Sequence, residues 1–153
     1  MTHAVVKMRG TIKTKPDVRR TLELLDLSRT NHCVLVEDNA HYNGMLQKVK
    51  DYVAWGTIDG ATLGVLLERR GALAGHKRLT NAYVKDRTDF DDINSLATAV
   101  VSGTATLQDV PDLKRVLRLH PPRKGHSGIK KPFPEGVLGF HGGEINELLL
   151  KMR

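Results

Sequence analysis

The chain has 153 residues, of which 40% are hydrophobic and 5% aromatic, so it can form one domain or a small core with a long extension. Its only cysteine, Cys33, excludes an internal disulfide and favours a reducing, cytoplasmic compartment. No apolar run approaches the roughly 20 residues that cross a bilayer. The N-terminus lacks the apolar core of a signal peptide, so we expect no membrane partner.

Three apolar segments in the first 58 residues predict β-strands. They are residues 4–9, ended by Gly10, residues 32–36, and residues 52–55, ended by Gly56. The middle segment is almost continuously apolar, which indicates a central or well-covered strand.

Two helices are predicted between these strands. Thr14 is a suitable N-cap for the first, Pro16 is tolerated in its first turn, and Asp17 favours the positive end of the helix dipole. The second helix starts near Asp38 or Asn39. The apolar face of the first comprises Val18, Leu22 and Leu25, and that of the second comprises Tyr42, Met45, Leu46 and Val49. Helices with one apolar face each would pack on one side of the sheet.

Beyond residue 58 the pattern indicates a helical and irregular extension. Asp59 can cap a helix that is closed by Arg69, Arg70 and Gly71, because cations and glycine suit a helix C-terminus. The later segments are a short turn from Thr80, an amphipathic helix capped by Asp91 and Asp92 and ended at Gly103, a strand within residues 116–119, and a last helix at residues 144–152. The apolar face of the last helix comprises Ile145, Leu148, Leu149 and Met152 and should dock on the body.

Positive charge is concentrated at the two ends of the chain. The formal net charge of +7 divides into +3 in residues 1–58, −1 in residues 59–110 and +5 in residues 111–153. Between Leu113 and Pro134 there are seven cations and no carboxylate. A basic balance of this kind indicates an anionic partner.

The most basic tract, residues 114–131, lies in a segment without regular pattern. From Pro121 to about Gly139 the chain shows no periodicity, so it cannot bury itself and is either mobile or ordered by a partner. Proline limits backbone entropy, glycine allows close approach to a phosphate, and Lys and Arg release counterions. These properties predict binding to RNA through shape, phosphate and 2′-hydroxyl groups. The alternatives are a solvated tail or a membrane-surface segment, although an apolar anchoring face is missing.

Residues that suggest catalysis have simpler structural interpretations. The histidines His120, His126 and His141 match no compact metal-ligand motif, and Cys33 lies in an apolar strand pattern. The acidic cluster comprises Asp86, Asp89, Asp91 and Asp92, and it fits helix capping and a solvated face. The aromatic residues Tyr42, Tyr52 and Trp55 could stack on bases, but Tyr42 and Trp55 fit the core better. We therefore expect no enzyme, no cofactor, no metal and no small-molecule substrate.

Several stretches together resemble one family of ribosomal proteins. They are Arg20-Thr21-Leu22 with Leu25 and Leu27, Asn43-Gly44-Met45 with Val49, Tyr52-Val53-Ala54-Trp55-Gly56, Leu67-Glu68-Arg69-Arg70-Gly71, Leu119-His120-Pro121-Pro122-Arg123-Lys124-Gly125, and Glu135-Gly136-Val137. This pattern is similar to the large-subunit family called L-thirty in bacteria and L-seven in eukaryotes, and its length matches the archaeal type. The resemblance implies an α+β fold, in which residues 1–58 form a βαβαβ module with a three-stranded antiparallel sheet and two helices on one face. Residues 59–153 would be an extension packed on the module and on RNA.

The resemblance also implies a structural role in the large ribosomal subunit, with large-subunit ribosomal RNA and neighbouring ribosomal proteins as partners. We expect three RNA-binding patches: Arg9, Arg19, Arg20 and Lys48; Arg118, His120, Arg123, Lys124, Lys130 and Lys131; and Arg69, Arg70, Lys77 and Arg78. The alternative is a nucleic-acid-binding regulator or RNA chaperone outside the ribosome. Sedimentation separates the two, because only the first predicts one copy per large subunit.

Overall fold

The computed structural model of the protein describes all 153 residues, which form an α+β fold around one mixed sheet. The strands are β1 (Thr2–Lys7), β2 (His32–Glu37), β3 (Val53–Thr57), β4 (Leu117–Arg118), β5 (Gly128–Pro132) and β6 (Gly136–Phe140), in the order β4-β2-β1-β3-β6-β5. The helices are α1 (Pro16–Leu24), α2 (Ala40–Val49), α3 (Gly60–Arg70), α4 (Asn81–Arg87), α5 (Ile93–Ser102) and α6 (Ile145–Met152), with short 3₁₀ turns η1 (Ala74–His76), η2 (Leu107–Asp109) and η3 (Gly142–Glu144).

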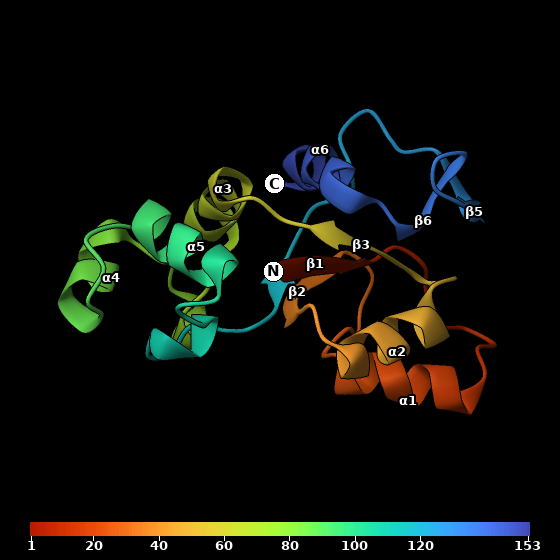
Figure 1. The fold of residues 1–153 in the computed structure, drawn as a ribbon, viewed down its shortest axis with the longest axis horizontal. Coiled ribbons are helices and arrows are strands. Elements are labelled where there is room, and N and C mark those ends of the chain that lie inside the picture. The colour runs from red at the N-terminus through yellow and green to blue at the C-terminus, as the bar shows by residue number, and fades with distance from the viewer.

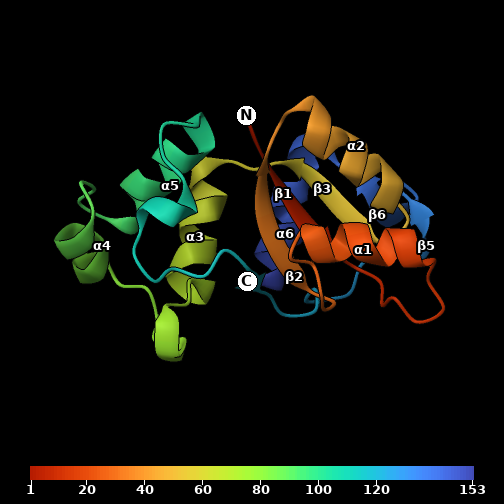
Figure 2. The same ribbon diagram turned by 90° about the horizontal axis from the view of Figure 1, so that it is seen from below.

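The centre of the sheet confirms the predicted antiparallel module. Strand β1 lies between β2 and β3, and Val5 stands opposite Val34 on one side and Trp55 on the other. Both pairings are antiparallel. Helices α1 and α2 cover one face, as predicted, and α6 lies on the other (Figures 1 and 2).

Alternate residues of β1 supply two separate apolar layers, because successive side chains of a strand point to opposite faces. Val5 packs with Leu22, Leu46 and Trp55 beneath α1 and α2. Val6 belongs to the larger cluster on the opposite face, which also contains buried residues of α3, α5 and α6. Helices α3, α4 and α5 form a group beside the sheet rather than over it (Figure 2).

The segment that follows Pro122 is more regular than its sequence indicates. The expectation that residues 121–139 lack structure of their own is wrong, because β5 and β6 extend the sheet and Val137 and Leu138 are buried. Strand β6 runs parallel to β3. Two apolar residues between glycines are too few to show periodicity, and they become a strand only beside the distant β3.

The helix boundaries confirm most of the predicted caps and correct one. Asn39, Asp59, Thr80 and Asp92 each cap a helix by accepting a hydrogen bond from a main-chain N–H three residues later. The assignment of Thr14 as a cap is wrong, because α1 begins at Pro16, Lys15 occupies the N-cap position, and Thr14 Oγ1 has no hydrogen-bond partner. Proline at the first helical position has no N–H, so this position leaves no donor for a cap to satisfy.

Two other boundaries lie close to their predicted places. Gly56 continues β3 instead of ending it, and it packs directly on the carbonyl of Gly142, where a Cβ atom would not fit. The last helix docks as predicted, with Ile145, Leu148 and Leu149 buried in the larger cluster. None of the helices combines the length and hydropathy needed to span a membrane.

Candidate nucleic-acid interface

Three of the residues that suggested chemistry, Cys33, His141 and Asp92, have structural roles. Cys33 is fully buried, and burial raises the pKa of its thiol to about 12, so it is no nucleophile at neutral pH. His141 is buried, lies within 2.7 Å of the carbonyl of Val137 through Nε2, and packs on Phe133 with ring centroids 4.3 Å apart. Asp92 accepts the main-chain N–H of Ser95 at 2.7 Å as the cap of α5.

Five basic side chains gather at one end of the sheet, where β1 ends and β2 begins. This sheet-end cluster comprises Lys7, Arg19, Arg29, His32 and Arg118. His32 and Arg118 are partners in the pairing of β2 with β4. The charges of Arg118, Arg29 and Lys7 act on the imidazole of His32, and that of Arg19 acts on Lys7. None of the five forms an ion pair with a carboxylate in the structure, so the positive charge of the four Lys and Arg side chains has no direct internal compensation.

In two members of the sheet-end cluster, Lys7 and His32, the surroundings disfavour the charged form of the side chain. Lys7 is only 2% exposed, and its Nζ donates a hydrogen bond to the carbonyl of Ser28 at 2.9 Å. Burial, followed by the charge of Arg19, lowers the pKa of Lys7. Burial, followed by the neighbouring cations, lowers the pKa of His32, whose Nδ1 has no hydrogen-bond partner. A bound anion would stabilise the charged form of both groups.

Arg9 leaves β1 at the same end of the sheet. Its guanidinium lies over the ring of Tyr52, 5.3 Å from the centroid, and donates to the carbonyl of Asp51 at 3.2 Å. Stacking on an aromatic ring fixes the position of a cation while leaving it partly exposed. Tyr52, considered at first for base stacking, therefore contacts Arg9.

Two other members of the first predicted patch, Arg20 and Lys48, form ion pairs with carboxylates. Arg20 lies 3.7 Å from Glu23, and Lys48 lies 3.7 Å from Asp17. All four side chains are exposed, so these ion pairs are weak and easily exchanged. The structure thus places Arg19 in the sheet-end cluster and leaves Arg20 and Lys48 outside it.

A second group of cations surrounds the C-terminal end of α3. This α3-end cluster comprises Arg69, Arg70, Lys77 and Arg78, and its role as an RNA-binding patch stays a prediction. The chain folds back after α3, so that residues 72 and 73 lie beside residues 77 and 78. Ala72 forms a β-bridge with Arg78, and the N–H of Leu73 donates to the carbonyl of Lys77 at 2.7 Å. The buried Nε of Arg70 has no hydrogen-bond partner. The main chain of Lys114 donates to the carbonyl of Ala72 at 2.9 Å, which ties the start of the basic tract to this cluster.

The middle of the basic tract is anchored to the end of α6. The N–H of His120 donates to the carbonyl of Met152, and that of Arg123 donates to the carbonyl of Lys151, both at 2.9 Å. These bonds satisfy carbonyls that a helix C-terminus leaves free. The side chains of His120, Arg123 and Lys124 are exposed.

The structure does not gather the second predicted patch into one surface. Arg118 lies on β4 and Lys130 and Lys131 lie on β5, and these strands are the opposite edges of the sheet. Lys131 also lies 3.7 Å from Glu135. From Arg118 in the sheet-end cluster the tract therefore runs past the end of α6 to the far edge of the sheet. In Figure 1 the light-blue ribbon passes α6 and reaches β5.

Three residues of the sheet-end cluster were not predicted. Lys7, Arg29 and His32 adjoin apolar strand segments, and sequence reasoning assigned their surroundings to the core. One feature of the sequence could have indicated them. Each lies at or shortly before or after the end of a predicted strand, and side chains from several strands can meet at such an end.

Fold and surface together define a class of protein. It is a small α+β protein whose cations gather in clusters around one sheet and whose buried Cys33 and His141 serve packing. Clustered cations of this kind are typical of proteins that bind a nucleic-acid backbone.

Comparison with known proteins identifies the family. The model of the family Ribosomal protein L30p/L7e matches residues 3–53. The chain is 53% identical over 150 residues to large ribosomal subunit protein uL30 of Archaeoglobus fulgidus, covering 98% of this chain and 99% of that protein. It is 51% identical over 152 residues to the protein of the same name from Methanothrix thermoacetophila, covering 99% of each chain. This chain belongs to the uL30 family of large-subunit ribosomal proteins.

Membership of this family confirms the resemblance inferred from the sequence. It makes the chain a structural constituent of the cytoplasmic large ribosomal subunit and not an enzyme. The near-complete coverage of both chains agrees with the expected archaeal type.

Proposed function

We propose that this protein binds large-subunit ribosomal RNA through the sheet-end cluster and thereby supports assembly of the subunit. The observation that carries the proposal is the convergence of four cations and His32 from β1, α1, the loop before β2, β2 and β4 without a carboxylate partner. Such a group attracts phosphates and releases counterions when one binds. Its cations come from distant segments, so the folded protein presents them in one fixed arrangement.

The two further basic regions supply additional backbone contacts in this proposal. The α3-end cluster lies beside the start of the tract, and the exposed side chains of residues 123–132 reach the opposite edge of the sheet. Residues 1–58 would act as the docking module, and residues 59–153 as an extension that packs on the module and on RNA. Neighbouring ribosomal proteins would be the other partners.

The experiment measures affinity for large-subunit RNA as a function of salt concentration. Replacing one phosphate-contacting cation, Arg118→Gln, should weaken binding and reduce the slope of log affinity against log salt by about one unit. Lys85→Gln is the matched control, because Lys85 is an exposed cation on α4 outside the three basic regions, and it should leave the slope unchanged. Both side chains are exposed, so neither variant should unfold the protein.

Two results would contradict the proposal. One is an affinity that does not depend on salt, combined with failure of the protein to sediment with the large subunit. The other is an Arg118→Gln variant that binds with the slope of the wild type while Lys85→Gln reduces it.

A further inference from the structure

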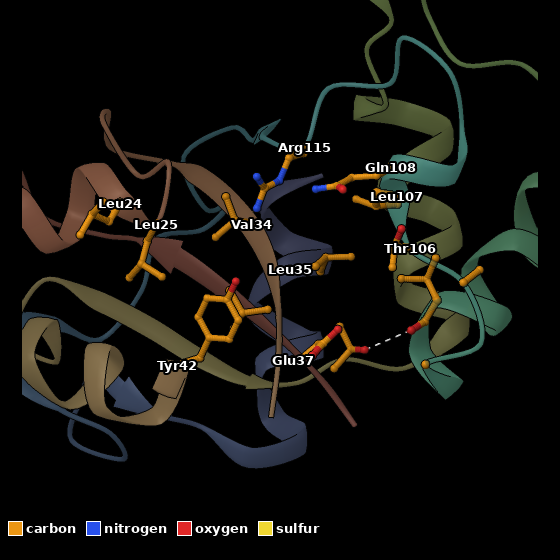
Figure 3. Close-up of a pocket in the computed structure, with 15 residues that line it drawn as sticks. Leu24, Leu25, Val34, Leu35, Glu37, Tyr42, Thr106, Leu107, Gln108 and Arg115 are labelled. Atoms are coloured by element: carbon orange, nitrogen blue, oxygen red, sulfur yellow. Dashed lines mark hydrogen bonds between the residues drawn. The ribbon is translucent and has the colours of Figure 1, made fainter. Parts of the chain in front are cut away.

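A groove lies between the central sheet and the helical group, beside strand β2. It has a volume of about 290 Å³. Figure 3 shows Leu24, Leu25 and Tyr42 on one side of it and Leu107 and Gln108 on the other. Leu24, at the margin of the groove, is 61% exposed. Nine of the fifteen lining residues are hydrophobic, so a partner that docks here needs apolar as well as polar groups.

The inner wall of this groove is an unpaired strand edge. Strand β4 pairs with only His32 and Cys33, and β2 continues beyond them to Glu37 without a neighbour on that side. The N–H of Leu119 donates to the carbonyl of Asn31, which shows that odd-numbered residues of β2 direct their main-chain groups to this edge.

Three main-chain groups on the open edge therefore have no partner. Alternation along the strand directs the N–H and C=O of Leu35 and the N–H of Glu37 toward the groove, and no hydrogen bond in the structure uses them. The carbonyl of Glu37 is satisfied locally by the N–H of Asn39 at 3.0 Å. Unpaired strand edges are ready templates for an additional strand.

We propose that this edge, with the groove beside it, is a docking site for an extended peptide segment of a neighbouring protein in the large subunit. The segment adds to the sheet as a strand of about four residues, the length of the open part of β2, and continues the line of β4. The proposal rests on the proposed place of the chain in the large subunit.

The chemistry of the groove selects a peptide over RNA. Its one cation, Arg115, already lies 3.8 Å from Asp26, and Glu37 is exposed at the opposite end without an ion pair. A phosphate would meet repulsion from Glu37 and a single exposed cation that already pairs with Asp26, whereas the sheet-end cluster offers several cations without a carboxylate partner. A peptide with apolar side chains on both faces would cover Leu24 and Leu107, and a Lys or Arg at its end would neutralise Glu37.

Photocrosslinking within purified large subunits tests the occupant. The photoreactive residue p-benzoylphenylalanine is placed at Gln108 or Leu24, which lie on opposite sides of the groove, and at Lys85 on α4 as the control. All three side chains are exposed, so the substitutions should preserve the fold. We expect both groove positions to crosslink to one short segment of a single ribosomal protein, and the control position to miss that segment.

Each other result overturns the inference. Crosslinks from both groove positions to RNA, crosslinks to a second copy of this chain, or no crosslink in particles that contain the variant would show that no such peptide occupies the groove. In all three of these cases the proposed function stands, because the chain is in the subunit. If none of the variants or the wild-type chain enters the subunit, the proposed function fails as well.

Amide hydrogen exchange tests the strand pairing itself. Exchange takes place in the free protein or in intact large subunits and is measured after quenching and dissociation. The N–H groups of Leu35 and Glu37 should exchange about tenfold more slowly in the subunit, as expected for one added hydrogen bond each. Val34 and Val36 are internal controls, because their main-chain groups already face β1. Unchanged exchange at Leu35 and Glu37 would exclude an added strand.

Discussion

The protonation of His32, which lies beside arginine and lysine side chains, should change when an anion binds. In the free protein, burial and then the charges of Arg118, Arg29 and Lys7 hold the pKa of His32 below its ordinary value of 6.5. The folded protein therefore binds a proton at His32 less readily than the unfolded chain does. As the pH falls through about 6.5 the unfolded chain is protonated first, so the contribution of His32 to folding stability declines. That loss is complete below the folded-state pKa.

A phosphate bound at the sheet-end cluster should reverse this effect, because opposite charge favours the protonated imidazole. We predict that RNA affinity, measured at constant ionic strength, increases as the pH falls through about 6.5 and that His32→Gln removes most of this increase. His41→Gln, at an exposed position on α2, is the control and should keep the increase. Equal pH dependence in the wild type and His32→Gln would place the RNA phosphate away from this side chain.

Individual residues near strand ends were the hardest to assign from sequence. Lys7 and His32 stand next to Val6 and Cys33, and local composition assigns all four to an apolar strand. Their charge becomes significant only because β4, a segment some 85 residues farther along the chain, brings Arg118 opposite His32. Periodicity contains no information about such a pairing.

At the scale of elements, local chemistry was a better guide. The caps at Asn39, Asp59, Thr80 and Asp92 depend on a side chain and an N–H only three residues apart, so the sequence alone predicts them. The apolar face of α6 was predicted for the same reason, since helical spacing aligns its members within one turn or two.

The docking of α6 leads to a stability prediction. Leu149 is completely buried, whereas its neighbour Leu150 is 39% exposed. Leu149→Ala should lower the free energy of unfolding by about 2–5 kcal/mol, because it removes apolar contacts and leaves a cavity. Leu150→Ala should cost much less and serves as the control. Denaturant unfolding measures both, and equal losses would show that α6 does not dock through Leu149.

The whole molecule combines an ordered body with an exposed basic segment. Residues 123–132 are all exposed, while the segment that follows returns to the sheet as β6 and buries Val137 and Leu138. The two parts should therefore respond differently to RNA, even though the sequence predicted one irregular tract for both.

Hydrogen exchange should separate these two parts. In the isolated protein, we expect amides in residues 123–132 to exchange faster than those of Val137 and Leu138, because the hydrogen bonds of an exposed turn and edge strand open at lower cost than those of buried main chain. In the intact subunit the first group should become protected and the second should change little. Equal protection of residues 123–132 in both states would mean that the tract is not ordered by its partner.

The sequence by itself determined the α+β class, the order of elements in the first 58 residues, the caps of α2, α3, α4 and α5 and the abundance of cations in the last third. These features depend on neighbours within one or two turns or on total charge. Tertiary structure decided that β4, β5 and β6 join the sheet, that Lys7, Arg29 and His32 meet Arg118, and that Arg118 lies on the opposite edge from Lys130. It also left the edge of β2 open beside Leu24. The reason is that strand pairing and charge clustering join segments far apart in the chain, whose meeting depends on the packing of the whole core.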